Sequence, residues 1–459
     1  MTSKAQRVCV LAVIAILMPL TSRADLYSAA EAFEAKEFER AFELYRELAE
    51  LGQPEAQENL AVMYVNGEGV KRNNVLGYAW AALAVENGRG EAAQEIVNQI
   101  EPHLSATARD RVAEIHANYG KAALEERLLP QVTPGVVNAK SCKVRTVADP
   151  ANYFPPDAKR QMISGVVLVE VTVAPDGRAR NVHAWYSLPS GLFDEAGRRV
   201  ALDNTYEPPK ENGVAVACTM RFRVKFSIGG GIGAETPEQE KILAEFRTKA
   251  EDGDPRSQLT YALLLEVRPE SHYQEPFTNW TLKAAQGGIP AAQYLVGMQC
   301  LSSAREKNQA KGLIWLRMAA DAGQTNAQAA LAYYLLRTNS GEDFGKAQDL
   351  LEKAAASSHP EGKFRLAAML AAAPEASRRD PKRALELLAQ VNDELDSDPT
   401  FFEIRAAAKA MMGEYAEAQK DQKLALQKAR KLGWDLTVPQ ARLASYADSK
   451  PWAGNFFVY

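Results

Sequence analysis

Two spacings of hydrophobic residues divide the chain into three parts. In residues 25–127 and 237–447, apolar residues recur three and four positions apart, which is typical of amphipathic helices. Between these blocks the spacing changes to alternation, which is typical of strands with one buried face. The pattern therefore predicts two helical blocks that flank a small strand-containing domain at residues 140–230, followed by a tail at 448–459.

Within the helical blocks, a short motif repeats every 35 residues. It reads Ala-x-x-Gly-x-x-x-small-Gln, and its copies begin at Ala49, Ala250, Ala285 and Ala320, with weaker copies at Ala84 and Ala355. A period near 34 with small residues at fixed offsets indicates stacked helical hairpins. The Gly ends one helix in a left-handed cap, and each hairpin must pack on its neighbours to bury its apolar face. Both blocks are therefore expected to be α-solenoids.

The middle domain reads as a three-stranded antiparallel sheet with one helix. Strands are expected at Gly165–Val173, Arg178–Tyr186 and Val214–Ile228, with a turn at Pro175–Gly177 and a helix within Gly191–Asp203. In the last strand, every second residue from Val214 to Ile228 is apolar, and the residues between them are mostly polar. A helix packed on one face of the sheet fits this alternation.

The amino terminus reads as a secretory signal. Two cationic residues precede an apolar run of 13 residues, Val8–Leu20, which is shorter than the ~20 needed to span a bilayer. Ser22 and Ala24 provide the small residues of a cleavage site before Asp25. We therefore expect residues 1–24 to be removed during export to the periplasm. The alternative is an uncleaved anchor in the inner membrane.

Composition excludes several classes of protein. Without residues 1–24, the chain has 51 basic against 58 acidic residues, and it is 46% hydrophobic and 24% charged as a whole. Nucleic acid is not expected as a partner, because binding to phosphates requires a clustered basic excess. The hydrophobic and charged fractions are those of a globular protein and not of a disordered one.

One segment of the N-terminal block resembles a known repeat family. Ala56, Leu60, Ala61 and Tyr64 precede a Gly67-x-Gly69-Val70 turn, and Ala79-Trp80 follows it. This string resembles the SEL-like subclass of tetratricopeptide repeats. Residues 280–330 resemble it well, and residues 401–430 are more similar to an ordinary tetratricopeptide hairpin. The resemblance implies binding of proteins or peptides, usually on a concave face.

The middle domain resembles the carboxy-terminal domain of TonB, the periplasmic energy transducer. The matching residues are Tyr153, Pro155, Ala158, 165–171, Asp176-Gly177, 192–196, 206–208, Gly213 and 222–226. In that family the last strand offers its edge to a peptide of an outer-membrane transporter. The resemblance therefore implies peptide pairing along Val214–Ile228. Unlike TonB, this chain has an internal domain of this kind and a solenoid in place of a Pro-rich spacer.

The last strand supplies the candidate partner-binding residues. Arg221, Arg223 and Lys225 alternate on its polar face. They form either a docking stripe for an acidic peptide or a solvated outer face, since outward residues of a half-exposed strand must be polar.

Two of the four cysteines are candidates for a disulfide. Cys142 lies just before the middle domain, and Cys218 lies on the apolar face of its last strand. In an oxidising compartment a bond between them would contribute at most roughly 4–5 kcal/mol on the chain-entropy model. The alternative is two separate buried thiols. Cys300 lies among apolar residues and is expected to be a packed core thiol.

Motifs for catalysis or cofactor binding were not found. The five histidines lack metal-helix spacing, and the sequence has no His-Glu-x-x-His, nucleophile elbow or P-loop. The glycine run 229–233 reads as a linker. We therefore expect no catalytic residues, no metal and no cofactor.

Three functional hypotheses remain open. The first is an exported, periplasmic scaffold or adaptor whose repeats and TonB-like strand bind proteins or peptides of the cell envelope. The second is a TonB-family transducer, or an accessory component of outer-membrane transport, with outer-membrane transporters as partners. It requires an uncleaved N-terminal anchor, and only then does the chain contact a membrane. The third is an envelope enzyme with an unrecognised site.

Overall fold

The computed structural model divides into two compact units. It describes residues 24–130, 142–161, 163–188, 191–211, 213–227, 237–266, 277–301, 306–338, 341–357, 360–391 and 398–456. The "N-terminal unit" contains the described residues of 17–134 and 235–324, and the "sheet unit" contains those of 135–234 and 325–459. Apart from Ala24, the predicted signal lies outside the described residues.

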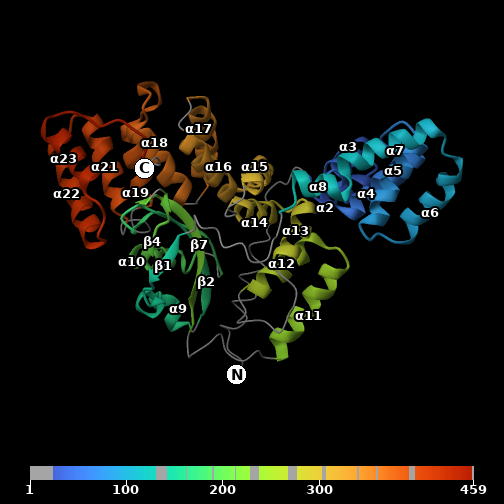
Figure 1. Cartoon of the computed structure of the whole chain (residues 1–459), viewed down its shortest axis with the longest axis horizontal. Helices are drawn as coiled ribbons and strands as arrows, with labels where there is room; N and C mark the ends of the chain where they lie inside the picture. Colours follow the sequence, from blue (N-terminus) through green and yellow to red (C-terminus); the bar gives the residue numbers. More distant parts are fainter. Residues whose placement is uncertain are drawn as a thin grey trace. The chain divides into compact units, whose positions relative to one another are not determined.

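The N-terminal unit consists of helical hairpins (Figure 1). Its helices are α2 (Leu26–Glu34), α3 (Phe38–Ala49), α4 (Pro54–Asn66), α5 (Asn74–Glu86), α6 (Glu91–Ile100), α7 (Ala106–Tyr119), α8 (Lys121–Arg127), α11 (Pro237–Glu251), α12 (Pro255–Glu266), α13 (Phe277–Gln286), α14 (Pro290–Leu301) and α15 (Glu306–Asp321). A short 3-10 turn, η1 (Glu101–His103), follows α6. Consecutive helices pack on one another from α2 to α6 and from α11 to α15, as the repeats predict.

The repeated Ala, Gly and Gln have a common structural role in this unit. The side-chain amides of Gln57, Gln258 and Gln293 each donate a hydrogen bond, of 3.2, 3.2 and 3.3 Å, to a backbone carbonyl eight residues earlier. The acceptors are the motif alanines Ala49, Ala250 and Ala285. The intervening glycines have φ between 83° and 99°, which reverses the chain at the helix end. The motif therefore satisfies carbonyls that a helix end leaves unpaired.

The Gly67-x-Gly69 turn explains the most specific part of the repeat pattern. Gly67 caps α4 in the left-handed conformation at φ 77°. Gly69 has φ 68°, and a Cβ atom there would lie 2.1 Å from the backbone oxygen of Phe38. Any side chain at this position would therefore collide with the preceding hairpin, so the turn requires glycine.

The sheet unit combines the middle domain with the last repeats. Its main sheet has the order β3–β2–β7, from β2 (Gly165–Val173), β3 (Ala179–Leu188) and β7 (Cys218–Phe226), and all pairs are antiparallel. Two small sheets pair β1 (Lys143–Thr146) with β4 (Thr205–Glu207), and β5 (Lys210–Glu211) with β6 (Val214–Ala215). The turn η2 (Pro150–Tyr153) and the helices α9 (Pro156–Arg160) and α10 (Asp194–Asp203) complete the middle domain.

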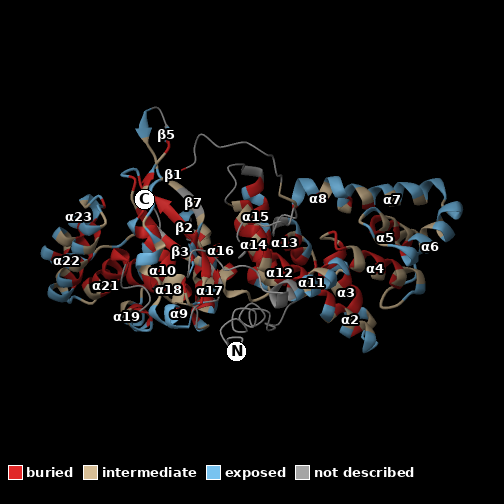
Figure 2. Ribbon diagram, turned by 90° about the horizontal axis from the view of Figure 1, so that it is seen from below, coloured by how far each residue is buried: buried red, intermediate tan, exposed pale blue. Residues whose placement is uncertain are grey.

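Helices from the C-terminal repeats form the rest of the sheet unit. They are α16 (Thr325–Thr338), α17 (Gly341–Ala356), α18 (Pro360–Ala372), α19 (Pro381–Ala389), α21 (Pro399–Met411), α22 (Tyr415–Lys431) and α23 (Thr437–Ala447), with a 3-10 turn η3 (Ala376–Arg378). Figure 2 shows that α18 and the centre of the sheet are buried. The predicted fold class, helical hairpins with a small antiparallel sheet and helix, is confirmed.

The predicted last strand is shorter in the structure. Val214 belongs to the small β5–β6 hairpin and is 67% exposed, so it does not continue the buried face of β7. The backbone N–H of Val216 donates to the carbonyl of Pro209, which keeps this residue out of the main sheet. Regular pairing begins at Cys218, and Ile228 lies outside the described residues. Alternation alone did not reveal this break, because a short hairpin continues the same period of two.

Candidate partner-binding surfaces

Strand β7 forms one edge of the main sheet. It pairs with β2 along its full length, from Gly165 opposite Phe226 to Val173 opposite Cys218, without a bulge. Within the described part of the chain, no strand pairs with its other side. An edge strand of this kind presents backbone N–H and C=O groups to which an extended segment can add.

The two faces of β7 differ in the way that the sequence predicts from residue 218 onward. Val224 and Phe226 point into the core with 3% and 1% exposure, and Phe226 stacks on Phe193 at a centroid distance of 5.1 Å. Arg223 and Lys225 are exposed on the opposite face. The backbone of Arg221 lies opposite Glu170 of β2, and its side chain lies outside what the structure describes. The structure thus places two of the three predicted cations together.

A disulfide fixes the beginning of β7. Cys218 is bonded to Cys142, which precedes β1, and the Cα atoms are 5.9 Å apart. Cys142 is 7% exposed and belongs to the core of the middle domain. Cys300 of α14 is a buried free thiol, and burial raises its pKa to about 11, so it remains protonated at neutral pH.

The face of β2 and β3 that points away from α10 packs on the C-terminal repeats. Sequence reasoning did not predict this contact, because alternation does not reveal what covers a polar face. The Thr172 and Tyr333 hydroxyls are 3.3 Å apart, which joins β2 to α16. Glu170, Thr172 and His183 are each no more than 5% exposed. The middle domain is therefore docked on the repeats through polar residues.

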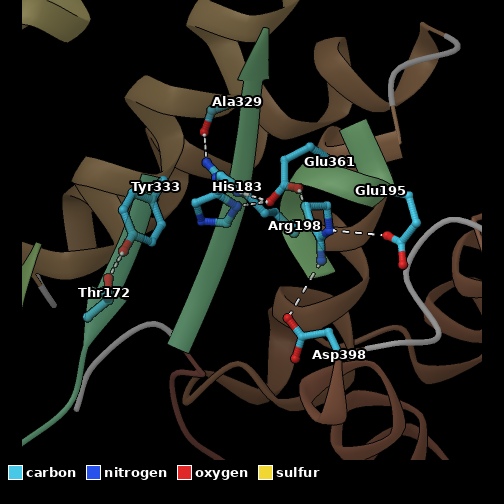
Figure 3. A network of polar contacts seen from close by, with 9 residues as sticks. Thr172, His183, Glu195, Arg198, Ala329, Tyr333, Glu361 and Asp398 are labelled. Atoms are coloured by element: carbon cyan, nitrogen blue, oxygen red, sulfur yellow. Dashed lines mark hydrogen bonds and ion pairs between the residues drawn. The ribbon is translucent and has the colours of Figure 1, made fainter. Parts of the chain in front are cut away.

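Five charged or titratable residues form what we call the docking cluster (Figure 3). They are His183 of β3, Arg198 of α10, Glu361 and Arg365 of α18, and Asp398, which caps α21. His183 Nδ1 lies 2.7 Å from Glu361 Oε1, and Arg365 Nε donates to the same oxygen at 2.8 Å. Arg198 lies 3.5 Å from Glu361 Oε2 and 3.7 Å from Asp398. One carboxylate on the repeats therefore contacts both the sheet and the helix of the middle domain.

Burial and charge determine protonation within the docking cluster. Burial and the charge of Arg365 lower the pKa of His183, so its imidazole is neutral at pH 7 with Nδ1 beside Glu361. Burial alone would raise the pKa of Glu361. Its contacts with His183, Arg365 and Arg198 outweigh burial and hold the pKa well below the usual range. The cluster is therefore an ionised carboxylate between two guanidinium groups and a neutral imidazole.

A second contact holds the tip of the β2–β3 hairpin. The guanidinium of Arg180 lies 3.9 Å from the ring centroid of Trp434, in the loop between α22 and α23, and it pairs with Asp176 at 2.8 Å. Asp176 also accepts a 2.8 Å hydrogen bond from the backbone of Asp435. Two separate contacts therefore fix the orientation of the middle domain on the repeats.

Two surface hollows are further candidate sites. One, of about 560 Å³, lies between α21 and α22 and is lined by Arg405, Lys409, Lys420, Lys423 and the buried Asp421, among others. The other, of about 500 Å³, lies in the N-terminal unit beside Leu51, Leu128 and Met318. In the described ranges, no group of three His, Cys, Asp or Glu residues is placed to hold a metal ion. No helix in the same ranges is long and apolar enough to cross a bilayer.

Models of known families match two kinds of segment in this chain. Residues 35–53, 54–88, 290–324 and 325–359 match the Sel1 repeat. Residues 150–228 match the Gram-negative bacterial TonB protein C-terminal model, which covers the main sheet and α10. Both assignments agree with the resemblances found in the sequence.

Curated relatives match part of the chain. The Sel1-repeat-containing protein YjcO of Escherichia coli strain K12 is 32% identical over 136 residues, and an uncharacterised YjcO of Shigella flexneri gives the same values. The match spans 30% of this chain and 57% of the length of these relatives.

Two solved structures are similar in part. One is c5321, titled a protective antigen of uropathogenic E. coli with an SLR fold, which is 18% identical with a TM-score of 0.35 over 90% of this chain and 80% of the other. The other is a Sel1 repeat protein from Oxalobacter formigenes, which is 13% identical with a TM-score of 0.30 over 80% of this chain and 98% of the other. On the family models, the chain carries Sel1 repeats and a TonB C-terminal domain.

Proposed function

We propose that this protein is a periplasmic interaction scaffold whose β7 edge pairs with an extended, acidic segment of an envelope protein. The C-terminal helices hold the TonB-like domain in a fixed orientation, and other surfaces of the repeats are open to further protein partners. We also propose that the chain is divided into N-terminal repeats at residues 25–127, a TonB-like domain at 140–230 and C-terminal repeats at 237–447. We assign no catalytic residue, metal or cofactor to it.

The observation that supports this proposal best is the contrast between the β7 edge and the rest of the sheet. The polar face of β2 and β3 contacts α16 and α18, and the tip of their hairpin contacts Trp434. In contrast, Arg223 and Lys225 are exposed on β7. These two residues are two positions apart, so their side chains are about 7 Å apart along one face. An added strand with acidic residues at alternate positions matches this spacing.

Main-chain pairing and charge contribute differently to such a complex. Strand addition supplies affinity through backbone hydrogen bonds, whereas side chains select the sequence. Exposed ion pairs contribute only about 0.2–1 kcal/mol each, so Arg223 and Lys225 are expected to choose among peptides more than to hold them. The proposal therefore requires an extended backbone in addition to negative charge.

The periplasmic location is supported by two features. Residues 1–24 have the pattern of a cleavable signal, and the Cys142–Cys218 disulfide favours an oxidising compartment. Intact-mass measurement of the exported protein tests this part of the proposal. A mature chain that starts at Asp25 supports the released periplasmic form, and a chain that retains residues 1–24 contradicts that form.

A role as a transducer or accessory component of outer-membrane transport is the second candidate. The TonB C-terminal match at residues 150–228 favours it, and it requires that residues 1–24 remain as an anchor in the inner membrane. Its partners would be outer-membrane transporters. The mass measurement described above separates it from the scaffold.

Peptide binding to purified protein tests the role of β7. A fluorescent peptide that alternates Glu with Thr should bind, and its N-methylated form should lose most of the binding because main-chain pairing is blocked. The double variant Arg223→Glu/Lys225→Glu should weaken binding by about tenfold, as two ion pairs of this size imply. Arg145→Glu, an exposed cation on β1, is the matched control and should have no effect. Equal binding of the methylated peptide would overturn the proposal.

A further inference from the structure

The chain folds back on the C-terminal repeats after α23. We call residues Asp448–Phe456 the "C-terminal strap". The backbone N–H of Gly454 donates to the carbonyl of Ala372 at 2.7 Å, and the side-chain amide of Asn455 donates to the carbonyl of Leu336 at 2.8 Å. These carbonyls lie in the last turns of α18 and α16, where a helix provides no N–H for them. The strap therefore donates hydrogen bonds to carbonyls at the ends of α16 and α18, two helices that lie far from it in sequence.

Two aromatic side chains anchor the strap. Trp452 and Phe456 are four residues apart, and their rings contact each other at a centroid distance of 4.8 Å. Phe456 is 4% exposed and belongs to the core of the C-terminal repeats, whereas Trp452 is partly buried at its margin. The guanidinium of Arg442, on α23, lies 4.0 Å from the Trp452 centroid and 4.7 Å from that of Phe456. The anchor is thus an aromatic pair on a cationic platform.

The platform beneath the strap is polar. Arg442 is 8% exposed and pairs with Glu403 at 2.8 Å, but its Nε has no hydrogen-bond partner in the part of the chain that is described. A buried N–H without a hydrogen-bond partner is destabilising. When the strap leaves, water can reach Arg442 and the two helix-end carbonyls. Release of the strap therefore exposes polar groups that water solvates well, in addition to apolar surface.

A left-handed helix cap joins α23 to the strap. Ser449 has φ 56°, and it and Lys36 are the non-glycine residues with positive φ within the described segments. Its backbone N–H bonds to the carbonyl of Tyr446, and that of Lys450 bonds to the carbonyl of Ser445, as at the glycine caps of the repeats. Glycine fits this conformation better than serine does. The cap is the point about which the strap would have to turn.

We propose that the C-terminal strap is an internally bound ligand of a docking surface on the C-terminal repeats. The surface consists of the ends of α16 and α18 together with Arg442. Its external ligand is a short, bent segment of a partner protein with two aromatic residues four positions apart, because the strap itself brings the rings of Trp452 and Phe456 together in this way. The partner displaces the strap by rotation about Ser449. This surface is separate from β7, so the proposal stands independently of strand pairing.

Hydrogen exchange of the intact protein tests whether the strap opens by itself. The amide of Gly454 should exchange at least about 100-fold faster than amides in the middle of α18, because a local opening releases it. The variant Ser449→Gly, whose glycine fits the left-handed cap better, should stabilise the closed form and slow this exchange several-fold. Equal exchange of Gly454 and of α18 would mean that the strap opens only with the whole unit, and it would overturn the proposal.

Peptide binding tests the docking surface directly. A chain that ends at Lys450 should bind a fluorescent peptide with the sequence of residues 450–459. The intact chain should bind it at least about tenfold more weakly, because a tethered segment competes at an effective concentration near millimolar. A peptide with Ala in place of both Trp452 and Phe456 is the control and should not bind.

A second variant covers the case in which the shortened chain does not fold. The full-length Trp452→Ala/Phe456→Ala protein retains the tail but loses its anchors, and it should also bind the peptide. Adding Arg442→Gln should weaken this binding by about tenfold or more, in line with a desolvated cation–π contact. If no folded variant binds the peptide, the strap is only a structural cap and the proposal fails. The Arg223→Glu/Lys225→Glu variant should not change this binding, which separates failure here from failure at β7.

Discussion

The two faces of the main sheet are both buried around β2, but they are buried in different ways. The face toward α10 is apolar, with Val167, Val169 and Val171 fully inaccessible and Phe226 nearly so. The face toward the repeats contains Glu170, Thr172 and His183. One face is thus an ordinary core, and the other is a polar interface between two parts of one chain.

This difference assigns separate roles to the two faces. A buried Val or Phe contributes about 1.5–3 kcal/mol by leaving water, largely without regard to orientation. A buried ionic cluster contributes little net stability, because desolvation offsets the attraction. However, the cluster destabilises every arrangement of the middle domain in which one of its buried charges loses its partner. The apolar face therefore stabilises the middle domain, and the polar face selects how that domain docks on α16 and α18.

Removing the charge at the centre of the docking cluster should have the largest effect. Glu361→Gln leaves Arg365, which is fully buried, and Arg198 without their shared carboxylate. Breaking a buried pair in this way costs about 3–5 kcal/mol. Urea unfolding, followed by hydrogen exchange of β2 amides, measures the loss.

Glu342→Gln is the matched control for this substitution. Glu342 lies on α17 and pairs with Lys346, but its side chain is 80% exposed. Its replacement should change the free energy of unfolding by less than about 0.5 kcal/mol. Equal effects of the two substitutions would show that the docking cluster does not select the arrangement.

Crowding the apolar face should have a smaller effect. A Cβ atom on Gly197 of α10 would lie 2.9 Å from the Cβ and Cγ1 of Val167 on β2. Overpacking of this kind costs about 1–3 kcal/mol, and the better helix propensity of Ala returns about 0.5–1. Gly197→Ala should therefore destabilise the protein by about 1–2 kcal/mol in urea unfolding.

Gly345→Ala is the comparison for this helix glycine. Gly345 lies in α17, and a Cβ there would meet only the end of the Arg378 side chain, at 3.5 Å. This variant should be as stable as the parent protein or slightly more stable. If Gly197→Ala behaves in the same way, α10 is not packed closely on β2.

Acid should weaken the polar face and leave the apolar face unaffected. The pKa of His183 is lowered from 6.5, so below that pH the unfolded chain takes up a proton that the folded chain excludes. The lowered pKa of Glu361 acts in the same direction below 4.5. Stability should therefore fall with decreasing pH, by at most about 1.4 kcal/mol per pH unit for one proton. His183→Gln should flatten the decline between pH 6.5 and 5, and an unchanged slope would contradict this assignment.

The same comparison explains what the sequence could and could not predict. The repeat positions were readable because each motif residue acts locally, as the bond from Gln57 to Ala49 shows. The alternation that includes Val167 and Phe226 could be predicted, because a strand face that packs on an apolar core requires an apolar residue at every second position. Contacts such as that between His183 and Glu361 join residues 178 positions apart, and no periodicity reports them. The break before Cys218 was missed because the β5–β6 hairpin has the same period as a strand.

The smallest effect on stability is expected at the exposed cations of β7, which are not buried in either face. Arg223→Ala and Lys225→Ala replace exposed side chains, so each should change the free energy of unfolding by less than about 0.5 kcal/mol. The same variants should weaken binding of the Glu-Thr peptide by about two- to fivefold each, since one exposed ion pair is lost. A loss of stability above 1 kcal/mol would mean that these side chains belong to the docked part of the sheet. Unchanged stability with weakened binding would identify β7 as the part of the sheet that remains open to a partner.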